Sequence, residues 1–273
     1  MAQPLTPAGS PPRPTSRTAA AVIGRPEAPA LHVRDVFKFH GPAGEEVGIL
    51  RGVSFELQRG EFLCVMGPSG SGKSSLLHLI AGLDQPSAGA INLFGEPLTE
   101  MDTADRTRLR RHAVGYVFQF FNLLPNLTVE ENVGLPLAIR GERPEHHRER
   151  IHALLTRFGI ADRANALPHQ LSGGQMQRTS IARALVGDQP LLLADEPTGN
   201  LSQAHGLEIL ETLRRVCDDD GRSVLLVTHN PRDAAYADRV AFLVDGKLDP
   251  DHMLHGPGLT TQAVHEALVA LHI

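Results

Sequence analysis

The stretch that decides the fold reads Gly67-Pro68-Ser69-Gly70-Ser71-Gly72-Lys73-Ser74. It matches the phosphate-binding loop pattern G-x-x-x-x-G-K-[ST] in full. The apolar run at 62–66 before it predicts a buried strand, and the run at 75–81 after it predicts a buried helix. A glycine loop at the start of a helix presents backbone N–H groups and the positive end of the helix dipole to an anion. The sequence therefore predicts an α/β fold that binds a phosphorylated ligand at this loop.

Two side chains at the end of the loop add specific chemistry. Lys73 contributes a mobile positive charge, and Ser74 contributes a hydroxyl that can bind Mg²⁺. The alternative is a flexible Gly/Ser turn without a ligand, and the Lys-Ser ending argues against it.

Composition limits the other classes of function. The 273 residues are 41% hydrophobic, which is enough for a large core, and the net charge of -5 does not suggest a general nucleic-acid binder. Cys64 and Cys217 lie far apart, as expected for two reduced cysteines of a cytosolic protein. No run of 18 apolar residues predicts a membrane span, and no apolar signal core is visible at the N-terminus.

The chain divides by composition into a tail, a core and an extension. Residues 1–29 contain seven prolines and few large apolar side chains, so we expect a disordered tail. We expect one domain around the phosphate-binding loop over 30–250, with a helical lobe at about 118–182, and a C-terminal extension with a short helix over 251–273. Several strands and helices follow from periodicity. We expect strands at 31–36, 53–57, 90–94, 114–118, 191–194, 224–227 and, as the last strand, 239–244, and helices at 103–112, 204–217 and 260–272. The runs at 191–194 and 224–227 are uninterrupted, which is typical of central strands that helices cover on both faces.

A second set of functional residues ends the run at 191–194. Asp195 follows the strand directly, where a carboxylate near a phosphate loop can hold Mg²⁺ through its water shell. Glu196 lies one residue further and can accept a proton from an attacking water, as a general base does. Alone, an apolar run that ends in Asp-Glu is more often an ordinary strand end; together with the loop at 67–74 it predicts a hydrolytic site.

A third segment has two glycines and a serine at the start of a predicted helix: Ser172-Gly173-Gly174-Gln175. It is another helix terminus suited to binding phosphate. With this segment the chain resembles the ATP-binding subunit of an ABC transporter, over about residues 31–250. The segment matches the family's signature motif, 67–74 matches Walker A and 191–196 matches Walker B.

The resemblance implies further site residues. Gln119 matches the Q-loop glutamine, which in the family touches Mg²⁺, and His229 matches the switch histidine, which contacts the γ-phosphate. Phe39 falls where the family stacks an aromatic ring on adenine. The resemblance thus places ATP against Phe39 and the loop from Gly67 to Ser75. It assigns catalysis to Glu196, His229 and Gln119, and Mg²⁺ to Ser74, Gln119 and Asp195.

One position departs from the family pattern. The family's Gly-Asn-Leu-Asp stretch reads Gly199-Asn200-Leu201-Ser202 here. The replaced Asp normally helps to join two ATP sites across a dimer, so Ser202 puts the strength of that coupling in doubt, but not ATP binding.

The resemblance also implies partners and a location. It implies an ATP-sandwich homodimer in which Ser172–Gln175 of one subunit face the loop of the other, an integral-membrane permease, no nucleic acid, and a peripheral place on the cytoplasmic face of the inner membrane. Details at 118–125 and 128–133 are similar to ATPases of macrolide exporters and lipoprotein-release systems. The alternatives are a regulatory ATPase that signals through a membrane partner without transport, and a soluble ABC protein that acts on DNA or ribosomes. The apolar residues of this segment belong either to a groove for the permease or to the lobe's own core; they are Phe120, Phe121, Leu123, Leu124, Leu127 and Val133.

Overall fold

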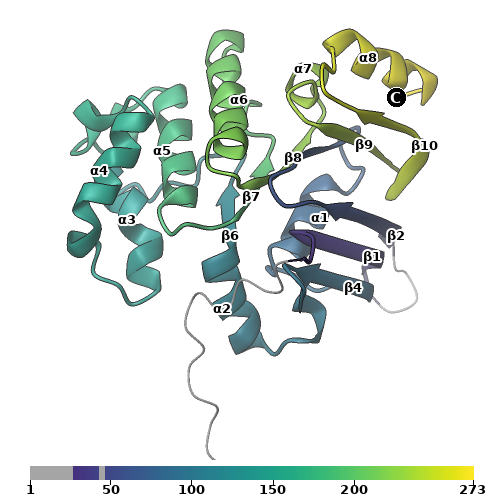
Figure 1. The fold of residues 1–273 in the computed structure, drawn as a ribbon, viewed down its shortest axis with the longest axis horizontal. Coiled ribbons are helices and arrows are strands. Elements are labelled where there is room, and N and C mark those ends of the chain that lie inside the picture. Colours follow the sequence, from purple (N-terminus) through teal and green to yellow (C-terminus); the bar gives the residue numbers. More distant parts are fainter. Residues whose placement is uncertain (1–26, 43–46) are drawn as a thin grey trace, which may run out of the picture.

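A computed structural model describes residues 27–42 and 47–273; most of the tail expected at 1–29 lies outside the described residues. The strands form two sheets (Figure 1). A four-stranded antiparallel sheet has the order β2-β1-β4-β5, and a six-stranded mixed sheet has the order β10-β9-β3-β8-β7-β6. The strands are β1 Leu31–His40, β2 Val47–Leu57, β3 Phe62–Met66, β4 Ala88–Leu93, β5 Glu96–Pro97, β6 Val114–Val117, β7 Leu191–Asp195, β8 Ser223–Thr228, β9 Arg239–Val244 and β10 Lys247–His255. The expected mixed α/β architecture is confirmed.

The central strands of the larger sheet are covered on both faces, as their uninterrupted apolar sequences predict. Every residue of β7 and β8 is buried. Successive residues of β7 enter different cores. Leu191 and Leu193 join the core covered by β1, β2, β4 and α1 (Lys73–Ile80), while Leu192 and Ala194 join the core under α6 (Gln203–Asp218). The alternation follows from the two-residue period of a strand. Parallel pairing of β3, β6, β7, β8 and β9 brings their carboxyl ends to one edge, where the loops at 67–74, 119, 196 and 229 begin.

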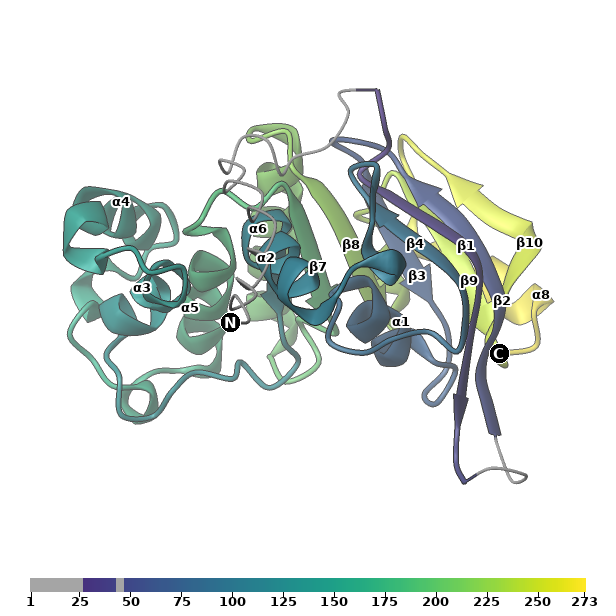
Figure 2. The ribbon, with the colours of Figure 1, turned by 90° about the horizontal axis from the view of Figure 1, so that it is seen from below.

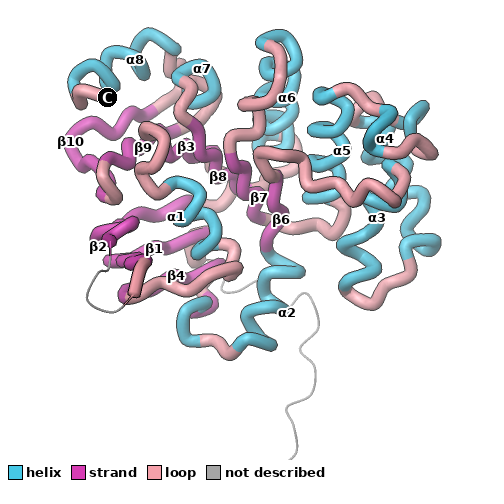
Figure 3. Tube along the Cα trace, turned by 180° about the vertical axis from the view of Figure 1, so that it is seen from behind, coloured by secondary structure: helices cyan, strands magenta, loops and turns pink. Residues whose placement is uncertain are grey.

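The helices lie around the two sheets (Figures 1 and 2). Helix α1 packs between the two sheets, on the face that Figure 3 shows in front. A group of α3, α4 and α5 forms the lobe at the left of Figures 1 and 2, and α7 and α8 lie beside β9 and β10. The helices are α1 Lys73–Ile80, α2 Thr103–Ala113, α3 Val129–Ile139, α4 Arg148–Arg157, α5 Gly173–Leu185, α6 Gln203–Asp218, α7 Pro231–Ala234 and α8 Thr261–Ala270. None of the described helices is long and apolar enough to cross a membrane.

One strand prediction was wrong. The sequence indicates that 239–244 is the last strand, but β10 follows it after a tight turn and pairs antiparallel with β9. β10 contains Pro250 and alternates poorly, and it lies at the edge of the sheet, where a missing N–H is tolerated. β10 also crosses residue 250, where we expected the core domain to end.

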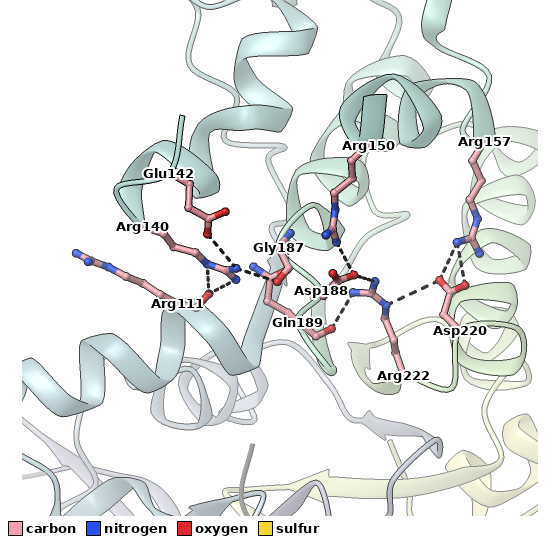
Figure 4. A network of polar contacts seen from close by, with 10 residues as sticks. All are labelled: Arg111, Arg140, Glu142, Arg150, Arg157, Gly187, Asp188, Gln189, Asp220 and Arg222. Atoms are coloured by element: carbon pink, nitrogen blue, oxygen red, sulfur yellow. Dashed lines mark hydrogen bonds and ion pairs between the residues drawn. The ribbon is translucent and has the colours of Figure 1, made fainter. Parts of the chain in front are cut away.

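Arginines join the helical lobe to the core (Figure 4). Arg140, after α3, donates to the carbonyl oxygens of Arg111 and Gly187. Arg157 of α4 donates to both carboxylate oxygens of Asp220, at 3.0 and 2.7 Å. Arg222 connects Asp220 with Asp188, which also pairs with Arg150 of α4. On the side away from the glycine loop, charged hydrogen bonds therefore hold the lobe to the core, in addition to apolar packing.

Candidate ATP site

The glycine loop wraps tightly around the start of α1. Gly70 and Gly72 have φ of 82° and 103°, values that favour glycine. At Gly67 an added Cβ would lie 2.1 Å from the carbonyl oxygen of Leu243, so the loop can pass β9 only without a side chain. The glycines of the motif therefore serve close backbone approach as well as curvature.

Lys73 points back into its own loop. Its Nζ donates to the carbonyl oxygens of Gly67 and Pro68, each at 2.8 Å, and lies 4.0 Å from Oε1 of Glu196. The residue is 5% exposed. Burial lowers the pKa of Lys73, while the nearby charges of Glu196 and Asp195 oppose that shift. This position holds the ammonium inside the concave face of the loop, where an anion can replace the carbonyl partners.

Ser74 and Asp195 meet between α1 and the end of β7. The Ser74 hydroxyl donates to Oδ1 of Asp195 at 3.1 Å, and the Tyr116 hydroxyl reaches Oδ2 at 3.4 Å. Burial raises the pKa of Asp195, although the hydrogen bond from Ser74 opposes the shift. A buried carboxylate beside a hydroxyl is a set of oxygen ligands of the kind Mg²⁺ prefers, and the unbalanced charge suits a cation.

The Glu196 carboxylate contacts the two other predicted catalytic residues, His229 and Gln119. Its Oε1 lies 3.1 Å from Nδ1 of His229, and its Oε2 accepts from the Gln119 amide at 3.3 Å. The N–H of Glu196 donates to the carbonyl oxygen of Val227, and the residue has a left-handed φ of 41°. Because β6, β7 and β8 are parallel neighbours, Gln119, Glu196 and His229 follow three strand ends at the same edge. The structure brings these three together beside Lys73.

The signature segment lies elsewhere in the chain. Ser172 caps α5: its Oγ accepts from the N–H of Gln175, and Oε1 of Gln175 accepts from the N–H of Ser172. Among the described residues, no hydrogen bond or ion pair joins Ser172, Gly173, Gly174 or Gln175 to the loop at 67–75. The two helix starts predicted to bind phosphate are therefore not joined by any such contact within the described chain.

Phe39 lies on the strand pair that flanks the loop. It is 39% exposed, and its ring stacks on Phe37 with centroids 6.3 Å apart. β1 pairs Phe39 with Gly48 of β2, and the next residues of β2, Ile49 and Leu50, lie against Gly72. An exposed aromatic face is thus available on the strand pair next to the glycine loop.

The sequence does not predict one buried carboxylate that lies close to the segments carrying Glu196 and His229. Asp233 of α7 is 2% exposed and accepts hydrogen bonds from the hydroxyls of Thr198 and Thr228. Burial raises the pKa of Asp233, which those two hydrogen bonds oppose. Asp233 joins the segment after Glu196 to the segment before His229. Nothing in the linear sequence marks this, since an Asp in a four-residue helix is ordinary.

The apolar segment after Gln119 is divided by the structure. Val133 is buried in the core that α3 and α5 share, whereas Phe120 and Leu124 are exposed. Val133 therefore belongs to the lobe's own core, whereas a role of Phe120 and Leu124 in a groove for the permease stays a prediction.

Comparison with known proteins identifies the family. The family model described as ABC transporter matches residues 50–199. The lipoprotein-releasing system ATP-binding protein LolD of Gluconobacter oxydans is 44% identical over 223 residues, which are 82% of this chain and 96% of that protein. The macrolide export ATP-binding/permease protein MacB of Syntrophobacter fumaroxidans is 40% identical over 223 residues, 81% of this chain but 31% of that protein. The pyoverdine export ATP-binding/permease protein PvdT of Pseudomonas aeruginosa is 42% identical over 82% of this chain and 34% of that protein. The chain thus spans about a third of the length of these two export proteins.

A solved structure agrees. The dimeric structure of a post-hydrolysis state of the ATP-binding cassette MJ0796, bound to ADP and Pi, has a TM-score of 0.77 and 37% identity. The match covers 84% of this chain and 99% of that one. The chain belongs to the ABC transporter family.

Proposed function

We propose that two copies of the chain bind two Mg²⁺–ATP between them and drive a membrane permease of the export or lipoprotein-release kind. The loop from Gly67 to Ser75 holds the phosphates, with Lys73 turning from its own carbonyls to the ligand. The exposed ring of Phe39 stacks on the adenine. Ser74, Asp195 and the amide oxygen of Gln119 are the ligands that fit Mg²⁺, which would neutralise charge on the phosphate oxygens.

The contacts of Glu196, His229 and Gln119 support a separate role for each in hydrolysis. Glu196 accepts the proton of the attacking water, since its carboxylate is held between Nδ1 of His229, 3.1 Å away, and the Gln119 amide, which donates at 3.3 Å. The His229 side chain is 55% exposed, so it can also contact the γ-phosphate. Gln119 is fixed in turn by Asn200, whose amide donates to the Gln119 carbonyl at 2.8 Å.

The separation of the two helix termini supports the dimer. Ser172–Gln175 form a capped helix start with exposed serine, and no phosphate loop in the same chain faces it. The MJ0796 cassette, 37% identical, is dimeric with ADP and Pi. A second copy would supply the missing half of each site.

An apolar cavity between the core and the helical lobe is the observation that carries the permease proposal. It has a volume of about 360 Å³ and lies between α2, β6, α3 and α5. Apolar side chains line it, with Arg110 and Arg111 also in the lining; the apolar residues include Leu83, Tyr116, Phe118, Leu135, Pro136 and Ile139. Leu83 and Ile139 are 50% and 51% exposed. A cavity of this kind suits an amphipathic helix of a partner, with acidic residues near the arginines.

The proposed partner also sets the location. LolD, MacB and PvdT are named for lipoprotein release and for macrolide and pyoverdine export. By this likeness we place the chain on the cytoplasmic face of the inner membrane, bound to an integral-membrane subunit.

Co-purification tests the permease proposal. The tagged full chain, solubilised in mild detergent from cells that produce it, should bring down one polytopic membrane protein in stoichiometric amount. Ile139→Asp should abolish this, because it puts a charge in the cavity, whereas Val269→Asp, at an exposed apolar position on α8, should not. Equal recovery with Ile139→Asp would exclude the cavity as the docking site. A partner that alters ATP hydrolysis in vesicles but moves no substrate would favour the regulatory ATPase instead.

A further inference from the structure

Arg183, near the C-terminal end of α5, makes an unusual set of contacts. Its guanidinium donates to the carbonyl oxygen of Asn122 at 2.5 Å and to that of Phe121 at 2.8 Å. A weaker contact reaches the Ser180 hydroxyl at 3.4 Å. The planar fork of a guanidinium matches two neighbouring acceptors, which a lysine ammonium cannot do with the same geometry.

The charge of Arg183 has no acidic partner. The residue is 9% exposed, and within residues 27–42 and 47–273 no carboxylate forms an ion pair with it. Burial lowers the pKa of Arg183 to about 10. Burying an arginine is unfavourable unless its donors are used, and here they are used on the backbone of one turn.

That turn is strained. Phe121 and Asn122 have φ of 55° and 48°, and the N–H of Asn122 donates to the carbonyl oxygen of Phe120. Non-glycine residues keep such conformations when their surroundings hold them there. The two short hydrogen bonds of the Arg183 side chain both go to carbonyl oxygens of this turn, and they therefore hold it in place.

The turn lies between two parts of the ATP site. Gln119, which contacts Glu196, is three residues before Asn122, and three residues span at most about 11 Å. On the other side, a Cβ added to Gly173 of the signature segment would lie 3.9 Å from Cζ of Phe121. The turn therefore lies close to both Gln119 and the signature helix start.

We propose that Arg183 is a positioning residue that fastens the loop carrying Gln119 to α5. A displacement of α5 then moves the turn, and with it the Gln119 amide relative to Glu196. Arg183 also lines the cavity proposed for the permease, next to Tyr116 and Phe118, so a partner seated there would touch the same fastening. The inference rests on the proposed role of Gln119 in hydrolysis.

The test separates hydrogen bonding from packing. Arg183→Met keeps most of the buried volume and removes the donors, whereas Arg183→Lys restores a donor. With the purified full chain we expect Arg183→Met to lower kcat at least tenfold, and Arg183→Lys, which keeps a donor but not the fork, to recover at least threefold over Arg183→Met without reaching wild type. The dissociation constant for a fluorescent ATP analogue should stay within twofold in both, since neither change touches the glycine loop.

Arg140 offers a matched control (Figure 4). It is also largely buried and also donates to backbone carbonyls, those of Arg111 and Gly187, but it is not bonded to the segment after Gln119. We expect Arg140→Met to leave kcat within twofold. An equal loss in Arg140→Met would mean that any arginine between lobe and core has this effect, and would overturn the inference.

Three other results would also overturn it: a kcat of Arg183→Met within twofold of wild type, Arg183→Lys no better than Arg183→Met, or weaker nucleotide binding that explains the loss. Should Arg183→Met not fold, Arg183→Leu, which also lacks donors, replaces it with the same limits. Gln119→Ala is measured in parallel. If Gln119→Ala lowers kcat and Arg183→Met does not, the positioning role of Arg183 is wrong while the role of Gln119 stands. If Gln119→Ala leaves kcat unchanged, the proposed role of Gln119 is wrong.

Discussion

At the scale of single residues, the backbone of Glu196 is held in a strained, left-handed conformation. Its φ of 41° is one that an L-residue adopts at a cost of roughly 1–2 kcal/mol. The backbone bond to Val227 and the side-chain contacts to His229 and Gln119 hold it there. Strain of this kind gathers at functional sites, where the surrounding fold fixes the orientation of a reactive group.

Glu196→Gln tests whether this orientation serves proton transfer. The amide keeps the shape but cannot act as a base, and a positioned base contributes about 10² to 10⁴ in rate. We expect kcat to fall by at least about 10² while ATP binding persists, as measured by phosphate release and by titration with a fluorescent analogue. Glu208→Gln, on the exposed surface of α6, should keep full activity. Unchanged hydrolysis in Glu196→Gln would remove Glu196 as the base.

Asp195 should reduce the stability of the nucleotide-free protein. Its pKa is raised by burial above the unfolded value of about 3.9. Its ionisation therefore favours the unfolded chain, and the penalty appears as the pH rises through the interval between the unfolded and the folded pKa. At pH 7 with chelator, Asp195→Asn should melt a few degrees higher, at about 2–4 °C per kcal/mol for a domain of this size. The same variant should lose most of the stabilisation by Mg²⁺ and ATP. A lower melting temperature without nucleotide would contradict this account.

The sequence was sufficient to find the residues at strand ends and helix starts, but not their tertiary partners. Lys73, Asp195 and Glu196 follow from local patterns, because a strand and a loop adjacent in the chain place them. Tyr116, Arg183 and Asp233 are separated from their partners by 79, 61 and 35 positions. Such contacts depend on strand order and helix packing, which local periodicity does not record.

At the scale of elements, the predictions were confirmed where a segment is fully buried or has a clear apolar period. β7, β8 and α6 follow from unbroken apolar runs and a clear helical period. β10 was missed because an edge strand buries little and tolerates Pro250. The segment after Gln119 was left open for a similar reason: its apolar residues divide between the core and the surface, and composition alone cannot assign them.

Ser202 has a structural role that the family comparison alone would not suggest. It is the N-cap of α6: its Oγ accepts from the N–H of His205 and contacts Nδ1 of His205 at 2.9 Å. Asp caps a helix about as well as Ser does. Replacement of the family's Asp therefore keeps the helix start and changes mainly the charge.

The stability of α6 gives the matching prediction. Ser202→Ala removes the cap and should cost about 1 kcal/mol, or roughly 2–4 °C in melting temperature. Ser202→Asp should melt within 1 °C or so of wild type, since the cap survives. Chemical denaturation of the three proteins measures the difference. Equal stability of Ser202→Ala and wild type would show that the His205 contacts do not hold the helix start.

At the scale of the whole molecule, the core and the helical lobe carry different parts of the proposed ATP site. The core carries the glycine loop, Asp195 and Glu196 on parallel strands, and the lobe carries Ser172 on α5 at the other side of Figure 1. The contacts of Arg140, Arg157 and Arg222 join the two parts on the side shown in Figure 4. Apolar residues of α3, α4 and α5 also belong to the buried core of the larger sheet, so packing as well as polar contacts holds the lobe to the core.

The dimer can be tested without disturbing this fold. Ser172→Asp keeps the N-cap of α5, because Asp is an equally good cap and its charge suits the helix dipole. The same carboxylate would lie where the partner's γ-phosphate must approach, so repulsion should block the ATP sandwich. In a Glu196→Gln background with Mg²⁺ and ATP, light scattering should show dimers for Glu196→Gln and monomers for Ser172→Asp/Glu196→Gln. Each monomer should still bind ATP through its own loop, with a dissociation constant within about threefold. Thr260→Asp, which changes the cap of α8 in the same way, should leave the dimer intact. Dimers of equal strength in the Ser172→Asp protein would mean that ATP is not held by the signature segment of a second copy.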